Sequence, residues 1–261
     1  MISSGRMKAA SVASLKHLIA SAVVAFFVAV FIFLVWYPYP YYQMAGGIGL
    51  FLIIMIVDII CGPLLTLVIF NPTKPREELL RDILVVVFLQ FIALSYGVYA
   101  IAEARPVFLA FEGDRFRVVS KADIDFEGWN QDNATQLTRL SLRGPVLIGT
   151  TLLDPSDIEF TASVIRSMNG VHPSHRPDRW VTYESQREAV KVNATPVARL
   201  KEVSQAYAET VNTLVTKLSM DEGDLGFYPL VSYSQDDWSV VVKTDSGELV
   251  GFLPLDAWIT R

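Results

Sequence analysis

The chain has 261 residues, of which 52% are hydrophobic and 19% charged, and its mean hydropathy is +0.37. Because an average soluble domain has about 25% charged residues, this composition indicates a membrane protein with a soluble part and excludes an intrinsically disordered chain. The net charge of −5 is divided into +2 over residues 1–102 and −7 over residues 103–261, so we expect no basic surface for nucleic acid.

Three long apolar segments predict membrane-spanning helices in a lipid bilayer. They cover Leu18–Trp36, Ala45–Phe70 and Ile83–Ala102, and each reaches the roughly 18 residues that a spanning helix needs. We interpret the first as an uncleaved helix rather than a signal peptide. Its apolar stretch exceeds the roughly 7–15 residues of a signal's apolar core, and an aromatic cluster over residues 36–42 follows it.

The basic residues predict how these helices are oriented. Lysine and arginine collect before the first helix and again between the second and third, at Lys74, Arg76 and Arg81, whereas the loop of residues 37–44 is uncharged. Since basic loops stay on the cytoplasmic side, we expect a cytoplasmic N-terminus and a C-terminal part on the outer side. The sequence thus predicts a three-helix transmembrane region over residues 1–103 and an outer domain over residues 104–261.

Asp58 lies near the middle of the second apolar segment, where a charged carboxylate costs roughly 2.5–3.5 kcal/mol on insertion scales. Two interpretations are open. A protonated Asp58 hydrogen-bonds Gln90 of the third segment and locks two helices together, or Asp58 meets a polar group of a partner helix. Gly62-Pro63 follows one turn later and predicts a kink, which is either a docking notch or only a bend.

Small residues recur at a spacing of four in two of the apolar segments. They are Ser21, Ala25 and Ala29 in the first segment and Ala93 and Gly97 in the third. Such stripes let helix backbones approach closely in lipid. They serve either packing within the bundle or the binding of a partner helix.

The region after residue 103 predicts an α+β domain with an antiparallel sheet. Alternation and turn residues predict a hairpin of strands 106–111 and 115–119, then strands within 144–153, 227–233, 239–244 and 249–253. Apolar residues at helical spacing predict helices over 154–168, 185–192 and 196–218. The expected fold class is therefore three transmembrane helices followed by a C-terminal α+β domain.

No motif in the sequence predicts catalysis, a cofactor or a metal site. His172 and His175 share one loop, but no third ligand accompanies them at the spacing of a metal site, and Ser174 lacks a Gly-x-Ser-x-Gly elbow. Cys61 is the single cysteine and excludes an internal disulfide. We therefore expect a protein that is not an enzyme, with no catalytic, cofactor-binding or metal-binding residues.

Ordered segments along the chain carry a family resemblance. They are Asp58, Gly62–Pro72 with Lys74, Asp82, Gln90, Ala93-Leu94, Tyr96–Tyr99, Ala104–Val107, Asp114–Phe116, and Phe252–Asp256 with Trp258. With these segments the whole chain resembles the TfpX/TfpZ family of type IV pilin accessory proteins. The resemblance implies a bacterial inner-membrane protein with a periplasmic C-terminal domain. It further implies a non-enzymatic, chaperone-like protein that binds the major type IV pilin and supports its stability, assembly or pilus dynamics.

A pilin awaiting assembly has a long apolar helix in the membrane and a head outside it, so we expect two contact regions. In the membrane, Asp58, Gly62 and Pro63, together with Gln90, are the expected helix-docking face. Their alternative role is internal packing, as described above.

The outer domain is expected to contact the pilin head near Arg105 and the pair Asp114-Arg115. Alternatively, Arg105 only anchors the chain at the membrane interface, and Asp114-Arg115 is only a hairpin turn with its ion pair. A membrane-anchored extracytoplasmic sensor or ligand-binding module is the alternative function, and it predicts a deep pocket in the outer domain. The sequence leaves the oligomeric state open.

Overall fold

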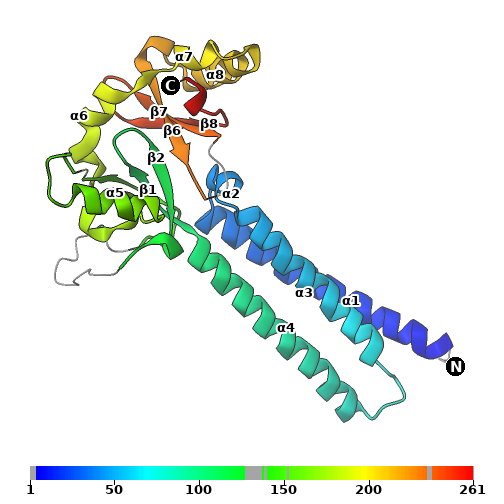
Figure 1. Ribbon diagram of the computed structural model, residues 1–261. Helices are drawn as coiled ribbons and strands as arrows, with labels where there is room; N and C mark the ends of the chain where they lie inside the picture. Colours follow the sequence, from blue (N-terminus) through cyan, green and yellow to red (C-terminus); the bar gives the residue numbers. More distant parts are fainter. Residues whose placement is uncertain (1–3, 127–136, 138–139, 152, 234–236, 261) are drawn as a thin grey trace. The chain divides into compact units, whose positions relative to one another are not determined.

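A computed structural model describes residues 4–126, 137, 140–151, 153–233 and 237–260. The chain divides into two compact units (Figure 1). The first contains the chain up to residue 38 and residues 46–104, and the second contains residues 39–45 and 105–261. The short segment 39–45, which joins two long helices of the first unit, is therefore part of the second.

Three long helices make up the first unit. They are α1 (Ser4–Phe31), continued by a π-helical turn over Ile32–Trp36, α3 (Gly47–Ile69) and α4 (Arg76–Ala104). All three are long and apolar enough to cross a membrane, which confirms the three predicted spans. Helix α3 packs against both α1 and α4. Most of the residues in the apolar stretches are not buried within the unit, as suits helices that face lipid.

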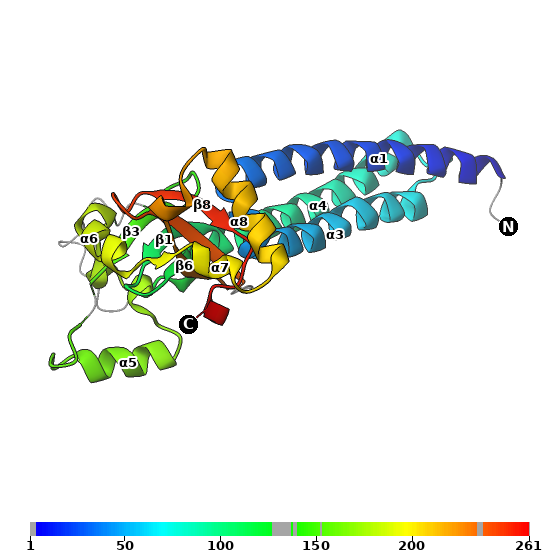
Figure 2. The ribbon, with the colours of Figure 1, turned by 90° about the horizontal axis from the view of Figure 1, so that it is seen from above.

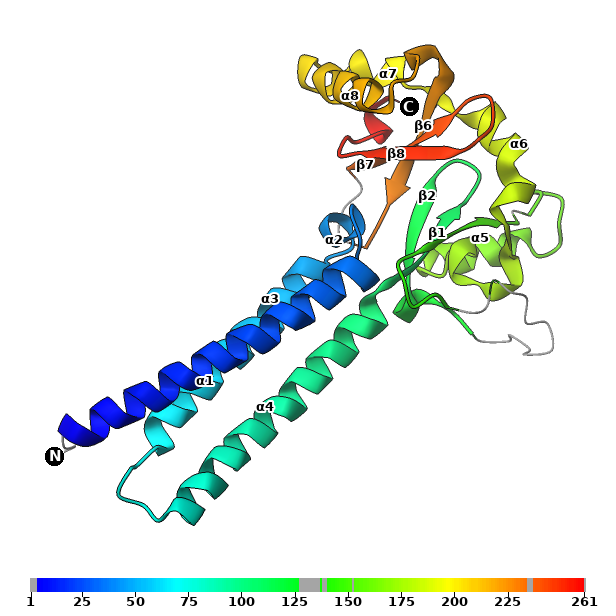
Figure 3. The same ribbon diagram turned by 180° about the vertical axis from the view of Figure 1, so that it is seen from behind.

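The second unit is built on an eight-stranded sheet with the order β4-β3-β1-β2-β6-β7-β8, and β5 pairs with β6 (Figure 3). The strands are β1 (Pro106–Phe111), β2 (Phe116–Ser120), β3 (Val146–Thr150), β4 (Trp180–Thr182), β5 (Thr195–Pro196), β6 (Leu225–Val231), β7 (Trp238–Lys243) and β8 (Leu249–Leu253). The helices of this unit are α2 (Tyr41–Met44), α5 (Phe160–Met168), α6 (Tyr183–Asn193), α7 (Ala198–Lys201) and α8 (Gln205–Leu218). Helix α5 lies apart from α7 and α8 (Figure 2).

The predicted fold class, three membrane helices plus an α+β domain, is confirmed, but the sheet is mixed rather than wholly antiparallel. The hairpins β1–β2 and β7–β8 are antiparallel as expected. The pairs β1–β3 and β2–β6, in contrast, are parallel. A parallel pair joins strands that are distant in the sequence, so neither pair has the local turn signal by which a hairpin is predicted.

Two of the predicted helices start or break differently because polar side chains bind the backbone. The helix expected from residue 154 begins at Phe160, since the Asp154 carboxylate accepts hydrogen bonds from the backbone N–H and hydroxyl of Ser156, at 2.9 and 2.6 Å, and so stabilises a turn. The helix expected over 196–218 is divided into α7 and α8. Ser204 caps α8 by accepting a hydrogen bond from the Tyr207 N–H at 3.3 Å.

The sheet has two halves, each with its own apolar cluster. In one half, α7 and α8 cover β6, β7 and β8 around Leu200, Val211, Phe227, Val241 and Leu253. In the other half, β1, β2 and β3 pack around Val107, Phe108, Val119, Ile148 and Trp180. The two halves join where β2 pairs with Leu230 and Val231, at the C-terminal end of β6. This pairing is short because β5 pairs with the same edge of β6 nearer its N-terminal end, at Gly226 and Phe227.

Segment 39–45 is anchored to the sheet of the second unit. The Ser232 hydroxyl, just after β6, donates a hydrogen bond of 2.6 Å to the Met44 carbonyl. The Tyr41 ring lies edge-on to Phe252 of β8, with the ring centroids 5.7 Å apart. Burial of Tyr41 raises the pKa of its hydroxyl, which therefore stays protonated. The loop between the first two spans is thus a structural part of the outer domain.

Candidate functional site

Asp58 and Gln90 are in contact within the membrane unit. The Gln90 Nε2 on α4 donates to the Asp58 backbone carbonyl on α3 at 3.1 Å and lies 3.4 Å from its carboxylate Oδ1. Asp58 is only 7% exposed. This geometry is that of the interhelical lock, one of the two interpretations of Asp58, and it places a carboxyl and an amide together in the middle of the bundle.

Gly62 and Pro63 lie inside the bundle beside this pair. A Cβ atom at Gly62 would overlap the Gln90 amide, so glycine is what lets the amide reach Asp58. The Pro63 carbonyl accepts a hydrogen bond of 2.8 Å from the Ser14 hydroxyl of α1. Both residues are buried, so their side of α3 faces α1 and α4.

His17 belongs to the same polar cluster, and the sequence reasoning missed it. Its Nδ1 lies 2.6 Å from the Thr66 Oγ1 of α3, which links α1 to α3. The signal was the spacing of Ser14, His17 and Ser21, three and four residues apart and therefore on one helix face. His17 escaped notice because it stands next to Lys16, at the edge of the first apolar segment.

Polar residues from all three helices line a cavity of about 240 Å³. It is lined by His17 and Ser21 of α1, by Asp58 of α3 and by Gln90, Phe91 and Leu94 of α4, among others. Two of the four expected docking residues, Asp58 and Gln90, line it, whereas Gly62 and Pro63 do not. A carboxyl, an amide, an imidazole and a hydroxyl in an otherwise apolar cavity offer both hydrogen-bond donors and acceptors to a polar group entering from the membrane.

The small-residue stripes are used partly within the unit. Ser21 and Ala25 are buried. Gly97 faces Ile54 of α3, where a Cβ atom would come within 2.5 Å of the Ile54 Cγ2. Ala93, by contrast, is exposed. The stripes therefore bring the three helices close to one another and leave one small residue of α4 at the surface.

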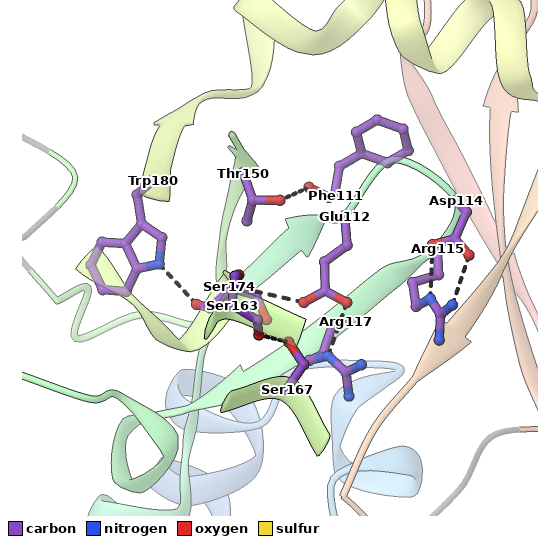
Figure 4. A network of polar contacts seen from close by, with 10 residues as sticks. All are labelled: Phe111, Glu112, Asp114, Arg115, Arg117, Thr150, Ser163, Ser167, Ser174 and Trp180. Carbon is purple, nitrogen blue, oxygen red and sulfur yellow. Dashed lines mark hydrogen bonds and ion pairs between the residues drawn. The ribbon is translucent and has the colours of Figure 1, made fainter. Parts of the chain in front are cut away.

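The outer residues expected at a pilin contact lie in ordinary structural roles. At the tip of the β1–β2 hairpin, the Asp114 carboxylate accepts hydrogen bonds from the Arg115 Nε and Nη2 at 2.8 and 2.7 Å (Figure 4). The Arg115 guanidinium also lies 4.7 Å from the centre of the Trp258 ring. Arg105 is buried, and its Nη2 donates to the Ser141 carbonyl at 3.4 Å. The Asp114–Arg115 contact is that of a hairpin turn with its ion pair, the alternative given for these two residues, whereas the Arg105 contact tests neither of the roles expected for that residue.

A buried ion pair, absent from the sequence reasoning, lies beside that hairpin tip. The Glu112 Oε2 accepts a hydrogen bond from the Arg117 Nε at 3.1 Å, and its Oε1 accepts one from the Ser174 N–H at 3.3 Å (Figure 4). The Trp180 Nε1 donates in turn to the Ser174 carbonyl at 2.8 Å. The signal was a charged residue on each side of the hairpin turn, at positions 112 and 117, where strand alternation places both on one face.

His172 and His175 pack against this ion pair, with ring centroids 5.2 Å apart. Burial, followed by the nearby positive charge of Arg117, lowers the pKa of His172 to about 4, and burial also lowers the pKa of His175. Both imidazoles are therefore neutral at pH 7. Among the described residues, no three or more His, Cys, Asp or Glu side chains come together to hold a metal ion.

A cavity of about 480 Å³ separates these groups from helix α5. Arg115, Arg117 and His172 form a polar side, and Phe160, Val164 and Met168 of α5 contribute an apolar side. Each charged group here already has a partner of opposite charge, so the cavity has mixed polar and apolar walls and no strong excess of either charge.

The family model and the three relatives that match this chain are all described as fimbrial assembly proteins. A family model described as "Fimbrial assembly protein FimB" matches residues 5–46. The serogroup E1 and serogroup I fimbrial assembly proteins of Dichelobacter nodosus are each 33% identical over 227 residues, which cover 87% of this chain and 88% of each relative. The fimbrial assembly protein of serogroups C1 and C2 from the same organism is 44% identical over 108 residues, or 41% of this chain and 82% of the relative. No solved structure matches the chain significantly.

Proposed function

The chain belongs to the fimbrial assembly protein family, and from that premise we propose that it is a bacterial inner-membrane accessory protein of type IV pilus biogenesis. In this proposal it binds the major pilin, in a chaperone-like and non-enzymatic role, and supports pilin stability, assembly or pilus dynamics. The N-terminus lies in the cytoplasm and the outer domain in the periplasm, as the basic loops favour. The more specific likeness to the TfpX/TfpZ proteins is part of the same proposal.

The observation that carries the proposal is the polar cavity in the membrane unit. Helices in lipid associate through close packing and interhelical hydrogen bonds. The cavity offers both, because Asp58, Gln90 and His17 stand among apolar side chains between the helices. A pilin waiting in the membrane exposes a long apolar helix, and a polar group on that helix would find partners here.

The proposed docking face contains fewer residues than the sequence predicted for it. Asp58 and Gln90 line the cavity and are the groups that a partner helix would reach. Gly62 and Pro63 support them from within the bundle, because one makes room for the Gln90 amide and the other holds α1 through Ser14. In the outer domain, Arg105, Asp114 and Arg115 remain candidate contacts with the pilin head.

Two phenylalanines on α4 provide a matched crosslinking test. Phe91 lines the cavity and is 65% exposed, and Phe88 does not line it and is 63% exposed. With the photoreactive residue p-benzoyl-phenylalanine at each position in turn, in cells that make the cognate pilin, we expect an adduct with pilin from position 91 and little from position 88. The absence of a pilin adduct from position 91 would overturn the proposed membrane contact.

The cavity beside α5 favours a second candidate function, that of a membrane-anchored sensor or ligand-binding module. Its volume of about 480 Å³ suits a small molecule. This alternative predicts that Ser167→Trp, which fills the cavity, abolishes fimbriation, and that position 91 traps no pilin. A pilin adduct from position 91 together with normal fimbriation of the Ser167→Trp strain would contradict it.

A further inference from the structure

We propose that the outer edge of β8 binds an extended segment of the major pilin, the subunit of the fimbria. This segment adds to the sheet as a further strand and presents an acidic side chain to Lys217. This inference rests on the proposed function for the identity of the partner, and it assigns the place and the mode of contact in the outer domain. The argument starts from the position of β8 in the sheet.

Strand β8 is the last strand of the sheet order, and within the described residues it pairs only with β7. Its pairing is regular over Gly251–Leu253, opposite residues 239–241, and the irregularity lies nearer its start. On an edge strand, alternate backbone N–H and C=O groups have no strand to bond to, and they form a template for another chain. The edge at the opposite end of the sheet, β4, has only three residues and runs directly into α6.

A groove of about 550 Å³ follows this edge. The consecutive residues 249–254 all line it. Because successive side chains of a strand point to opposite faces, a groove lined by every residue in turn runs along the edge rather than over one face. Helix α8 borders it on one side with Thr213, Leu214 and Lys217, and Tyr39 and Pro40 border it as well. Figure 3 shows α8 alongside β8.

The groove lies where the edge of β8 meets helix α8. The strand lies so close to α8 that a Cβ atom at Gly251 would come within 3.2 Å of the Leu214 Cδ1. A groove between a strand edge and a helix lets a partner bond to the strand with its backbone and place alternate side chains against the helix. An incoming helix has its own backbone bonds already satisfied, so it would leave the edge of β8 unused.

Charge indicates which residue the partner carries. Among the described residues that line the groove, Lys217 is the one with a charged side chain, although the chain from residue 103 onward has a net charge of −7. A cation in a groove without carboxylates complements an Asp or Glu side chain within the bound segment. Apolar side chains of that segment would pack on Leu214 and Leu249.

Two threonines of α8 give a matched pair of variants. Thr213 and Thr216 are both exposed, and each hydroxyl donates a hydrogen bond of 2.8 Å to the carbonyl four residues earlier. Only Thr213 lines the groove. The change Thr213→Trp therefore fills the groove, and Thr216→Trp adds the same side chain to α8 outside it.

The test measures binding of purified cognate fimbrial subunit to the full-length protein in detergent, together with hydrogen exchange. We expect Thr213→Trp to weaken binding at least about tenfold, equivalent to about 1.4 kcal/mol, and Thr216→Trp to change it less than about twofold. Lys217→Glu should also weaken binding. The amides of residues 249–253 should exchange more slowly when the subunit is bound.

Three results would overturn the inference, and they are distinguishable. Equal affinity of wild type and Thr213→Trp would exclude the groove and leave the proposed function intact. Protection of residues 249–253 that rises with the concentration of the chain alone would mean that a second copy occupies the edge. If the wild-type protein binds no subunit in either the binding assay or the hydrogen-exchange measurement, the proposed function is overturned as well.

Discussion

His172 is a half-buried imidazole near two arginines. Arg117 and Arg115 oppose its protonation, as does His175, and Glu112 favours it, but burial has the largest effect and lowers its pKa to about 4. In an unfolded chain the pKa of histidine is about 6.5. Between about pH 6.5 and about pH 4, the His172 imidazole therefore binds a proton in the unfolded chain but not in the folded protein. The contribution of neutral His172 to stability is present above this interval and is lost as the pH falls through it.

We expect the outer domain to become less stable as the pH falls from about 6.5 to about 4, and His172→Gln to reduce this loss because glutamine does not titrate. The readout is the midpoint of thermal unfolding, followed by near-ultraviolet circular dichroism of the full-length protein in detergent. Burial also lowers the pKa of His175, which should account for part of the pH dependence that remains. The unfolding midpoint of the His172→Gln/His175→Gln variant should therefore depend even less on pH. Equal slopes for wild type and His172→Gln would contradict the prediction.

At the scale of single residues, the sequence offered a hydrogen bond to Gln90 as one of two interpretations of Asp58, because Gln90 is the amide at the same depth of the third segment. The structure has this contact, and it leaves the second interpretation, a polar group of a partner helix, as a proposal. His17 and Glu112 were not predicted, because a histidine beside a lysine and a glutamate beside a turn are common on solvated surfaces. Only the tertiary packing buries Glu112 and brings Thr66 to His17.

At the scale of secondary-structure elements, Gly62 determines how closely α4 approaches α3. Alanine there would require the Gln90 amide to move away from Asp58, whereas a Cβ atom at Gly49 of the same helix would meet no atom within 4 Å. We expect Gly62→Ala to destabilise the membrane unit by about 1–3 kcal/mol relative to Gly49→Ala, the range typical of overpacking. Unfolding of the full-length protein by titration with sodium dodecyl sulfate measures the difference.

A double-mutant cycle separates the Gln90 contact from a general effect of alanine in α3. If the cost of Gly62→Ala arises from displacement of the Gln90 amide, that cost should largely vanish in a Gln90→Ala background. An undiminished cost in that background would assign the effect of Gly62 to something other than its contact with Gln90.

The elements themselves were largely predictable, and their non-local pairing was not. Hydrophobic length predicted α1, α3 and α4, and turn residues predicted the hairpins β1–β2 and β7–β8. The parallel pairs β1–β3 and β2–β6 join strands separated by long stretches of chain. No turn specifies such a register, which follows from packing of the whole domain.

At the scale of the whole molecule, Tyr41 tests whether segment 39–45 stabilises the outer domain. Tyr41 is buried against Phe252, whereas its neighbour Tyr42 is only partly buried. We expect Tyr41→Ala to lower the free energy of unfolding of the outer domain by about 3 kcal/mol, as for other buried aromatic side chains. Tyr42→Ala should cost less than about 1 kcal/mol. Chemical denaturation of the full-length protein provides the comparison, and equal costs would mean that the segment is only a connector.

The hydrogen bond from Ser232 to Met44 spans 188 positions of the chain, and this has a consequence for biosynthesis. Residues 39–45 leave the ribosome long before Ser232 and Phe252, the residues to which this segment binds. The loop between the first two spans, already fixed between two membrane helices, therefore stays without its binding sites until strands β6 to β8 have been made. The outer domain completes its fold only then, and a fragment that starts at residue 105 would lack one of its own structural pieces.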